Sequence, residues 1–182
     1  RIAWFEGGKL NACYNCVDRH VEAGHGDATA IIWEGNDPDE SRAFTYAELH
    51  SEVQKAANAL KALGIGKGDR VCIYLQMVPE LAIAMLACVR IGAVHSIVFG
   101  AFSADSLVSR INDSECKLII TQDTGVRGVK LDIPMKANAD SAVTQTPSIE
   151  HMLVVRRTGG AVAMEDERDV WWHDALGEAD AE

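Results

Sequence analysis

Apolar and polar positions recur along the chain with the periods of helices and strands, and the clearest helical pattern lies between residues 44 and 64. Six apolar residues there share one helical face: Leu49, Val53, Ala56, Ala57, Leu60 and Leu63. Thr45 and Glu48 form the T-x-x-E pattern of a capping box, which predicts that the helix begins next to Thr45. Gly64 follows the last apolar position and predicts the end of this helix.

Short apolar runs predict the strands of a sheet. They cover residues 71–75, 93–99, 117–121 and 151–156. Pro79 suits the first turn of a second helix, which runs to Ile91 and contains LAIAMLACV (81–89), a stretch expected to be buried on all sides. Ser103 is a candidate cap for a third helix, over ADSLVSRIN. Strand–helix–strand units of this length indicate an α/β fold, doubly wound in style, with a parallel sheet and helices on both faces.

The two ends of the chain follow other patterns. NACYNCVDRHVEAG predicts an amphipathic helix, and ATAIIWEG with RAFTY predicts a pair of strands joined by the polar turn NDPDES. The tail from residue 156 carries a Gly-Gly turn, an acidic loop and a short aromatic segment around WWHDAL.

Charge and composition narrow the classes of partner. The chain has 182 residues with 27 acidic against 17 basic side chains, for a formal net charge of −10. Non-specific nucleic-acid binding needs a broad basic surface, so we expect no nucleic-acid partner, and any anion site must be local. The longest apolar stretch, residues 81–89, is too short to span a bilayer. Five cysteines without disulfide-rich spacing favour free thiols and a cytoplasmic location.

CYNC (13–16) is a C-x-x-C pattern, with His20 four residues further on. On a regular helix Cys13, Cys16 and His20 share a face, which leaves open a metal or redox site. A closed zinc site needs four ligands and no second such pair follows, and a thioredoxin-like motif would follow a strand and open a helix. We therefore expect the cysteines to be packing residues. GGK (7–9) and GIGKGD (64–69) lack the complete phosphate-loop pattern and predict turns.

Two glycine-bearing segments follow predicted strands. FGAFS (99–103) and GVRGVK (125–130) would lie at the carboxyl edge of the parallel sheet, where open α/β folds bind ligands. The start of the helix after Ser103 favours an anion, and Arg127 and Lys130 supply positive charge. The alternative is a pair of ordinary strand-to-helix turns with a solvated Arg–Lys pair. Pattern alone leaves both interpretations open.

Several long stretches resemble the amino-terminal part of the acetyl-CoA synthetase family, within the acyl-adenylate-forming superfamily. The most distinctive are WFEGGKLNACYNCVDRH (4–20) and GIGKGDRVCIYLQMVPELAIAMLACVRIGAVHSIVFGAFS (64–103), and the resemblance runs over essentially all 182 residues. Propionyl-CoA synthetase shares a version of this opening and is the nearest alternative. The resemblance implies a leading segment at residues 1–43, with the helix and strand pair. It also implies an α/β portion of the family's large N-terminal domain at 44–182.

The resemblance also implies an activity. The full-length enzyme would join ATP and acetate to give acetyl-adenylate and pyrophosphate, with Mg²⁺ accompanying the ATP, and CoA would then displace AMP. In the family the loop at 125–130 meets the nucleotide end of CoA, with two arginines near its 3′-phosphate. Arg127 matches the first arginine, Lys130 stands at the second, and Gly128 and Val129 lie between them. Gly100 and Ala101 match a second CoA contact, although the family commonly has glycine at the position of Ala101.

No catalytic residue is expected in this chain. The family's Gly/Ser/Thr-rich phosphate loop, its acetate pocket and its C-terminal domain lie beyond the matching stretches, so we expect an inactive fragment that begins and ends inside a longer protein. Strand edges covered elsewhere in that protein would be exposed and favour self-association. Two alternatives remain from other classes: a freestanding, non-catalytic CoA- or nucleotide-binding module, and a structural or redox protein that uses CYNC.

Overall fold

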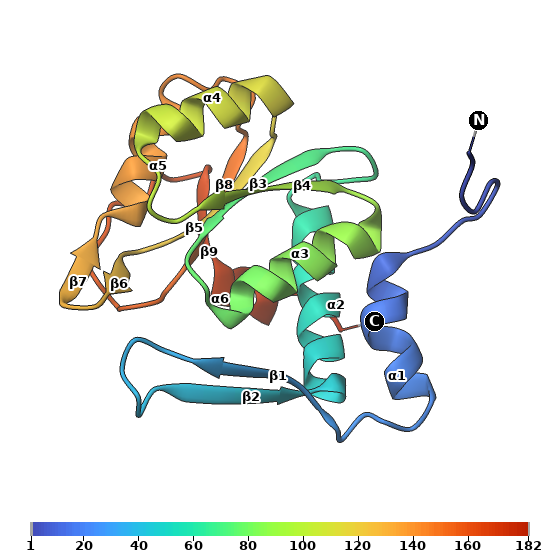
Figure 1. Ribbon diagram of the computed structural model, residues 1–182. Coiled ribbons are helices and arrows are strands. Elements are labelled where there is room, and N and C mark those ends of the chain that lie inside the picture. Colours follow the sequence, from blue (N-terminus) through green and yellow to red (C-terminus); the bar gives the residue numbers. More distant parts are fainter. Residues whose placement is uncertain (1, 182) are drawn as a thin grey trace.

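A parallel five-stranded sheet with helices on both faces forms the centre of the computed structural model, which describes residues 2–181 (Figure 1). Its strands are β3 (Arg70–Leu75), β4 (Val94–Phe99), β5 (Leu118–Gln122), β8 (His151–Val155) and β9 (Asp169–Trp171). They lie in the order β4-β3-β5-β8-β9, and every neighbouring pair is parallel. The α/β prediction is confirmed.

The strand order reverses beside β3. From β3 the chain passes through α3 (Pro79–Ile91) to β4 on one side, and from β4 through α4 (Ala104–Ser114) to β5 on the other side. Right-handed crossovers in opposite directions place α3 and α4 on opposite faces of the sheet. α5 (Met135–Val143) continues in the direction of α4 and lies on the same face. The reversal leaves a crevice at the carboxyl ends of β3 and β5, the position where such sheets bind ligands.

Two hydrophobic clusters cover the two faces of the sheet. On one face α2 (Tyr46–Ala62), α3 and α6 (Trp172–Gly177) pack over alternate residues of β3, including Val71 and Ile73. On the other face α4 and α5 pack over Cys72 and Tyr74. Alternate residues of a strand point to opposite faces, so a strand buried on both sides is apolar throughout, as β3 is. The predicted capping box of α2 is present in full.

The N-terminal part contains the predicted helix and strand pair. A π-helical turn, η1 (Tyr14–Asp18), leads into the short α1 (Arg19–Glu22). β1 (Thr29–Glu34) and β2 (Ser41–Thr45) then pair antiparallel and lie below the sheet in Figure 1. No helix in the described part of the chain is long and apolar enough to cross a bilayer.

The π-helical turn separates the two cysteines of CYNC. Cys13 is fully buried, but Cys16 is exposed, so the prediction that both are packing residues is wrong for Cys16. A π-helical turn brings residues five apart together, and the Cys13 thiol accordingly lies 3.9 Å from a carboxylate oxygen of Asp18. Burial raises the pKa of Cys13, which keeps it a neutral thiol.

The segment 125–130 is a hairpin and not a loop. β6 (Gly125–Arg127) and β7 (Lys130–Ile133) pair antiparallel beyond the end of β5. This hairpin, α5 and β9 were not predicted from the sequence. Strands of three or four residues are too short to show a period of two, which explains why the hairpin and β9 were not predicted.

Two further details differ from expectation. Ser103 stands at the N-cap of α4, but its hydroxyl forms no capping hydrogen bond. The stretch 81–89 of α3 has no exposed residue, yet Met85, Leu86 and Val89 are only half-buried, so the helix is not buried on all sides. Gly92 ends α3 in the left-handed conformation, as expected of a glycine in that position.

Candidate functional site

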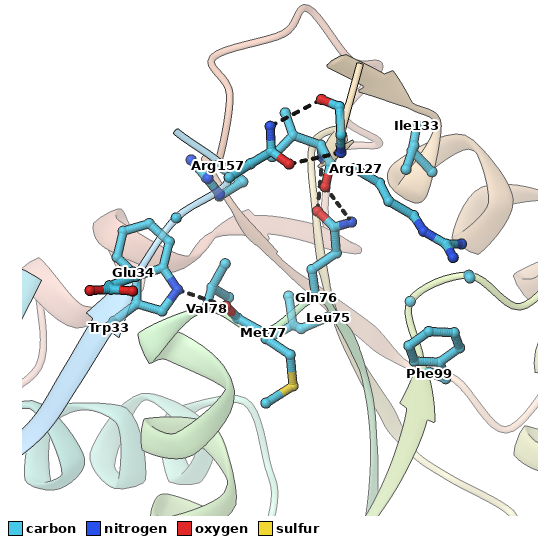
Figure 2. A pocket seen from close by; sticks show the side chains of 16 residues that line it. Trp33, Glu34, Leu75, Gln76, Met77, Val78, Phe99, Arg127, Ile133 and Arg157 are labelled. Atoms are coloured by element: carbon cyan, nitrogen blue, oxygen red, sulfur yellow. Dashed lines mark hydrogen bonds between the residues drawn. The ribbon is translucent and has the colours of Figure 1, made fainter. Parts of the chain in front are cut away.

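A cavity of about 330 Å³ opens at the carboxyl edge of the sheet, where the strand order reverses (Figure 2). Segments that follow β3, β4 and β5 contribute to its walls, together with the loop after β1 and the segment after β8. The lining residues are Trp33, Glu34, Gly35, Asn36, Leu75, Gln76, Met77, Val78, Phe99, Gly100, Ala101, Val126, Arg127, Gly128, Ile133 and Arg157. The volume falls in the range of small-molecule sites, about 300–1,000 Å³.

The β6–β7 hairpin brings the two predicted basic residues together. Arg127 and Lys130 are cross-strand partners, joined by a two-residue turn of Gly128 and Val129. Gly128 has φ +58°, a left-handed conformation that suits a tight turn and that glycine adopts without strain. Val129 is 97% exposed at the tip. Arg127 and Gly128 line the cavity, whereas Val129 and Lys130 lie outside its wall.

Two carboxamides hold β6 on the side away from β7. The Gln76 side chain donates to the Val126 carbonyl at 3.0 Å and accepts from the Val126 amide at 2.9 Å. The Asn36 side chain donates to the Gly128 carbonyl at 3.0 Å and accepts from the Gly128 amide at 2.7 Å. Both residues that flank Arg127 are therefore fixed through both of their backbone polar groups.

Close packing against the Gln76 side chain favours glycine at position 125. A Cβ atom at Gly125 would lie 2.7 Å from the Gln76 side-chain oxygen, which is closer than real Cβ contacts come. Gln122 holds Gln76 in place from β5, since its amide nitrogen donates to the Gln76 side-chain oxygen at 3.2 Å. The oxygen of Gln122 also accepts from the Gln76 backbone amide at 2.9 Å.

The opposite wall joins the β1–β2 pair to the sheet. The Trp33 indole donates to the Met77 carbonyl at 2.7 Å, and the Arg157 guanidinium lies over the Trp33 ring at 5.2 Å from its centroid (Figure 2). Arg157 also donates to both carboxylate oxygens of Glu40, at 2.5 and 2.6 Å. The positive charge of Arg157 is thus matched within the protein.

A buried carboxylate supports this wall from beneath. Asp123 is fully buried at the end of β5 and accepts hydrogen bonds from a cluster of backbone amides. The donors and their distances are Thr124 at 2.7 Å, Arg157 at 2.9 Å, Thr158 at 3.2 Å and Gly159 at 2.8 Å. Such bonds satisfy the buried charge, and they fix the segment that carries Arg157 against the end of β5.

The floor of the cavity follows β4. Gly100 is buried, and a Cβ there would lie 3.2 Å from both the Leu75 carbonyl oxygen and the Gln76 side chain, so close packing favours glycine. Ala101 is exposed, and its methyl group therefore has room on the open side. Phe99 is 63% exposed at the rim and meets Phe102 edge to face. The cavity thus has an apolar side next to the hairpin.

Among residues 2–181 the side chains of Arg127 and Lys130 form no hydrogen bond or ion pair with the protein. Figure 2 shows the Arg127 side chain extending into the open side of the cavity, on the side of Ile133 and Phe99. An exposed guanidinium beside apolar surface is suited to bind a phosphate, because its planar fork donates two parallel hydrogen bonds. The arrangement fits a ligand with an apolar body and an anionic group.

A family model described as AMP-binding enzyme matches residues 17–180. The chain belongs to this family. Three curated relatives, each called acetyl-coenzyme A synthetase, come from Rubrobacter xylanophilus, Halorhodospira halophila and Alkalilimnicola ehrlichii. Their sequences are 61%, 59% and 54% identical to the chain over 98%, 98% and 100% of its length. The chain spans 28%, 27% and 28% of the length of these relatives. The resemblance to acetyl-CoA synthetases over essentially the whole chain is confirmed.

The sequence patterns did not point to Trp33, Asn36, Gln76 or Arg157, all of which line the cavity. Trp33 lies in a predicted strand and Asn36 in a predicted polar turn, and neither position carries a ligand-binding motif. Their grouping depends on contacts between segments far apart in the chain. The only signal available was that Gln76 directly follows a buried strand at the carboxyl edge of the sheet.

The described residues contain no group of three or more His, Cys, Asp or Glu side chains that suits a metal ion. In the N-terminal part, the Arg90 guanidinium lies 2.8 Å from both oxygens of Asp18 and balances its charge.

Proposed function

We propose that this chain forms part of the CoA-binding site of an AMP-forming acetate–CoA ligase. The observation that carries the proposal is the position of Arg127: a guanidinium without a protein partner among residues 2–181, at the apolar cavity where the sheet order reverses. The names of the relatives support the reaction, and the cavity supports a ligand that combines a purine with a phosphate.

The proposed reaction has two steps. Acetate attacks the α-phosphorus of ATP and gives acetyl-AMP and pyrophosphate, with Mg²⁺ accompanying the nucleotide. The thiolate of CoA then attacks the acetyl carbonyl carbon, and AMP leaves with the electron pair of the broken C–O bond. Adenylation is needed because a carboxylate oxygen is a poor leaving group and AMP is a good one. The described residues bear on the second substrate, CoA, and on neither chemical step directly.

The hairpin would bind the 3′-phosphate of CoA. Arg127 would donate a forked pair of hydrogen bonds to the phosphate, and Lys130, its cross-strand partner, would add a point charge. Gly128 and Val129 form the turn that holds these two side chains together. Gly128 and Val129 have no polar side chain, so only the backbone of the turn could contact the ligand through hydrogen bonds.

The floor would bind the adenine ring. Phe99 offers an exposed aromatic face, and Ile133 adds apolar surface on the hairpin side. Base–aromatic stacking contributes about 1–3 kcal/mol per base. Gly100 and Ala101 would lie under the ribose and the diphosphate, where small side chains allow close approach.

Two alternative functions differ from the proposed acetate–CoA ligase in ways that can be measured. Propionate in place of acetate would give propionyl-CoA by the same chemistry, and the cavity described here bears on CoA and not on the acyl group. A non-catalytic CoA- or nucleotide-binding module would use the same cavity without forming an adenylate. Location and assembly also belong to the proposal: a cytoplasmic enzyme, and a 182-residue chain that on its own self-associates through β4, an exposed strand edge.

The complete protein encoded by the gene tests the proposal. It should form acetyl-CoA and AMP in equal amounts from acetate, ATP and CoA, with a higher kcat/KM for acetate than for propionate. A higher kcat/KM for propionate would favour the propionyl-CoA synthetase alternative. CoA binding without AMP formation from either acid would favour the non-catalytic module.

A further inference from the structure

β6 is a three-residue strand with an unusual environment. On one side it pairs with β7, and on the other side no strand is present among residues 2–181. A two-stranded hairpin is marginally stable alone, and an unpaired edge leaves backbone amides and carbonyls without partners. Some other group must satisfy the edge of β6 if the hairpin is to keep one conformation.

Carboxamides supply those partners. A carboxamide has one acceptor oxygen and a donor nitrogen, so it can replace the peptide unit of a missing strand. Successive residues of a strand direct their backbone groups to opposite sides: Arg127 faces β7, while Val126 and Gly128 face outward. Gln76 meets both polar groups of Val126, and Asn36 meets both polar groups of Gly128.

The two carboxamides come from distant parts of the chain. Gln76 follows β3 and lies 50 residues before Val126, and Asn36 lies in the β1–β2 connection, 92 residues before Gly128. Gln76 is itself held by Gln122. The β1–β2 connection is held where the Gly35 amide donates to the Glu40 carbonyl at 2.6 Å. The backbone on both sides of Arg127 is therefore fixed, while its side chain stays available to a ligand.

We propose that Asn36 and Gln76 are positioning residues for the binding of the 3′-phosphate by Arg127. They act through the backbone of β6, and the guanidinium of Arg127 makes the contact with the phosphate. This inference rests on the proposed function for its ligand. The geometric part, that the two carboxamides hold the hairpin, stands on the hydrogen bonds alone.

Asn36→Ala in the complete protein is the central variant, because Asn36 is exposed and its loss leaves the core intact. Asn112→Ala is the matched control: Asn112 is an exposed residue of α4 outside the cavity lining, and it donates to the Gln145 carbonyl at 3.1 Å. The two variants delete the same side chain, and each removes side-chain-to-backbone hydrogen bonds. Gln76→Ala serves as the second variant if it folds.

The kinetic readout is the ratio of KM for CoA to KM for dephospho-CoA, which lacks the 3′-phosphate. Loss of the Asn36 hydrogen bonds should raise this ratio between about twofold and tenfold, and kcat should change little. Asn112→Ala should leave the ratio unchanged. In an Arg127→Ala background, Asn36→Ala should have no further effect on the ratio, because the residue through which it acts is gone.

Hydrogen exchange provides a readout that does not depend on the proposed ligand. Peptides covering residues 125–133 should exchange at least several-fold faster in Asn36→Ala than in the wild type or in Asn112→Ala. An unchanged exchange rate would overturn the positioning role. Equal losses on CoA and dephospho-CoA, or a full Asn36→Ala effect in the Arg127→Ala background, would overturn it as well.

The same measurements distinguish a failure of the proposed function from a failure of the inference about Asn36 and Gln76. If the wild-type protein does not distinguish CoA from dephospho-CoA, the 3′-phosphate assignment is wrong. Faster exchange in Asn36→Ala would then still support the clamping of the hairpin by Asn36. If the wild type distinguishes the two and Arg127→Ala does not, while Asn36→Ala retains full discrimination, only the inference about Asn36 and Gln76 is wrong.

Discussion

The Arg157 guanidinium donates to both carboxylate oxygens of Glu40 across 117 residues of chain, at 2.5 and 2.6 Å. The pair is partly buried, with side-chain exposures of 13% for Arg157 and 37% for Glu40. It joins the β1–β2 connection to the segment after β8, and with Trp33 it forms the wall opposite the hairpin. The cavity therefore depends on an ion pair that no local pattern indicates.

Breaking this pair should destabilise the protein. Glu40→Gln removes the charge of the acceptor, and hydrogen bonds between charged groups contribute about 1–3 kcal/mol to the free energy of unfolding. Denaturant unfolding of the variant and the wild type measures the difference. Glu165→Gln is the matched control: Glu165 is 69% exposed and lies 3.6 Å from Arg168, so its loss should cost less than about 0.5 kcal/mol. Equal effects of the two substitutions would contradict the structural role of Glu40.

Low pH should destabilise the N-terminal helical segment, residues 12–22. Burial alone would raise the pKa of Asp18, but the hydrogen bonds and charge of Arg90, together with His50, hold its pKa below the ordinary value. A carboxyl group with a lowered folded-state pKa stabilises the fold above its unfolded pKa of about 3.9, and this stability is lost as the pH falls through the folded-state value. The protection factors of residues 12–22, which compare the measured exchange with the intrinsic rate at the same pH, should therefore fall below about pH 4.

Asp18→Asn separates this effect from general acid unfolding. The variant should exchange faster than the wild type at pH 7 in residues 12–22, and its protection factors there should depend less on pH below about pH 4. Asp27→Asn, at an exposed position in the following turn, should behave as the wild type. Identical pH profiles for Asp18→Asn and the wild type would show that the Asp18–Arg90 contact does not hold the helix.

Local signals explain the parts of the fold that could be predicted. Thr45 and Glu48 cap α2 because their side chains reach only neighbouring backbone groups, and Gly92 ends α3 because glycine accepts a positive φ. The sheet followed from apolar runs, of which those in β3, β5 and β8 are buried on both faces. The division into residues 1–43 and 44–182 stays a prediction.

The cavity walls could not be predicted because their partners are distant. Gln122 and Asp123 are polar and look like loop residues, yet both are fully buried because other segments satisfy their polar groups. The hairpin turn Gly128–Val129 lacks the Asn-Gly signal of a tight turn. Both backbone polar groups of Gly128 are hydrogen-bonded to Asn36, which lies 92 residues earlier. The resemblance supplied Arg127 and Lys130, but not their cross-strand pairing.

The 182-residue chain alone should self-associate through β4. This strand has β3 on one side only among the described strands, and three of its apolar residues are exposed: Val94, Ile97 and Phe99. Ile97→Lys should reduce both sedimentation as oligomers and binding of a hydrophobic dye, because a charge at a strand edge opposes pairing. Ile32→Lys changes an exposed residue of β1 and should not. A wild-type chain that stays monomeric and binds no dye at high concentration would contradict this.

The same 182-residue chain should not form acetyl-adenylate. Adenylation requires groups that hold the β- and γ-phosphates of ATP, and the sequence contains no complete phosphate-loop pattern. Acetate-dependent exchange of labelled pyrophosphate into ATP should stay at the level of a buffer control. Exchange clearly above that level would show that residues of this chain suffice for the first step.

Arg127→Ala in the complete protein tests the central claim most directly. A charge-assisted contact with a partly exposed phosphate contributes about 1–3 kcal/mol, so KM for CoA should rise roughly tenfold or more. KM for dephospho-CoA should barely change, and pyrophosphate exchange should be unaffected because adenylation precedes the entry of CoA. Lys130→Arg is expected to lower KM for CoA, since it restores a forked donor at the cross-strand position. Equal losses of Arg127→Ala on CoA and dephospho-CoA would show that Arg127 supports the hairpin and does not bind the 3′-phosphate.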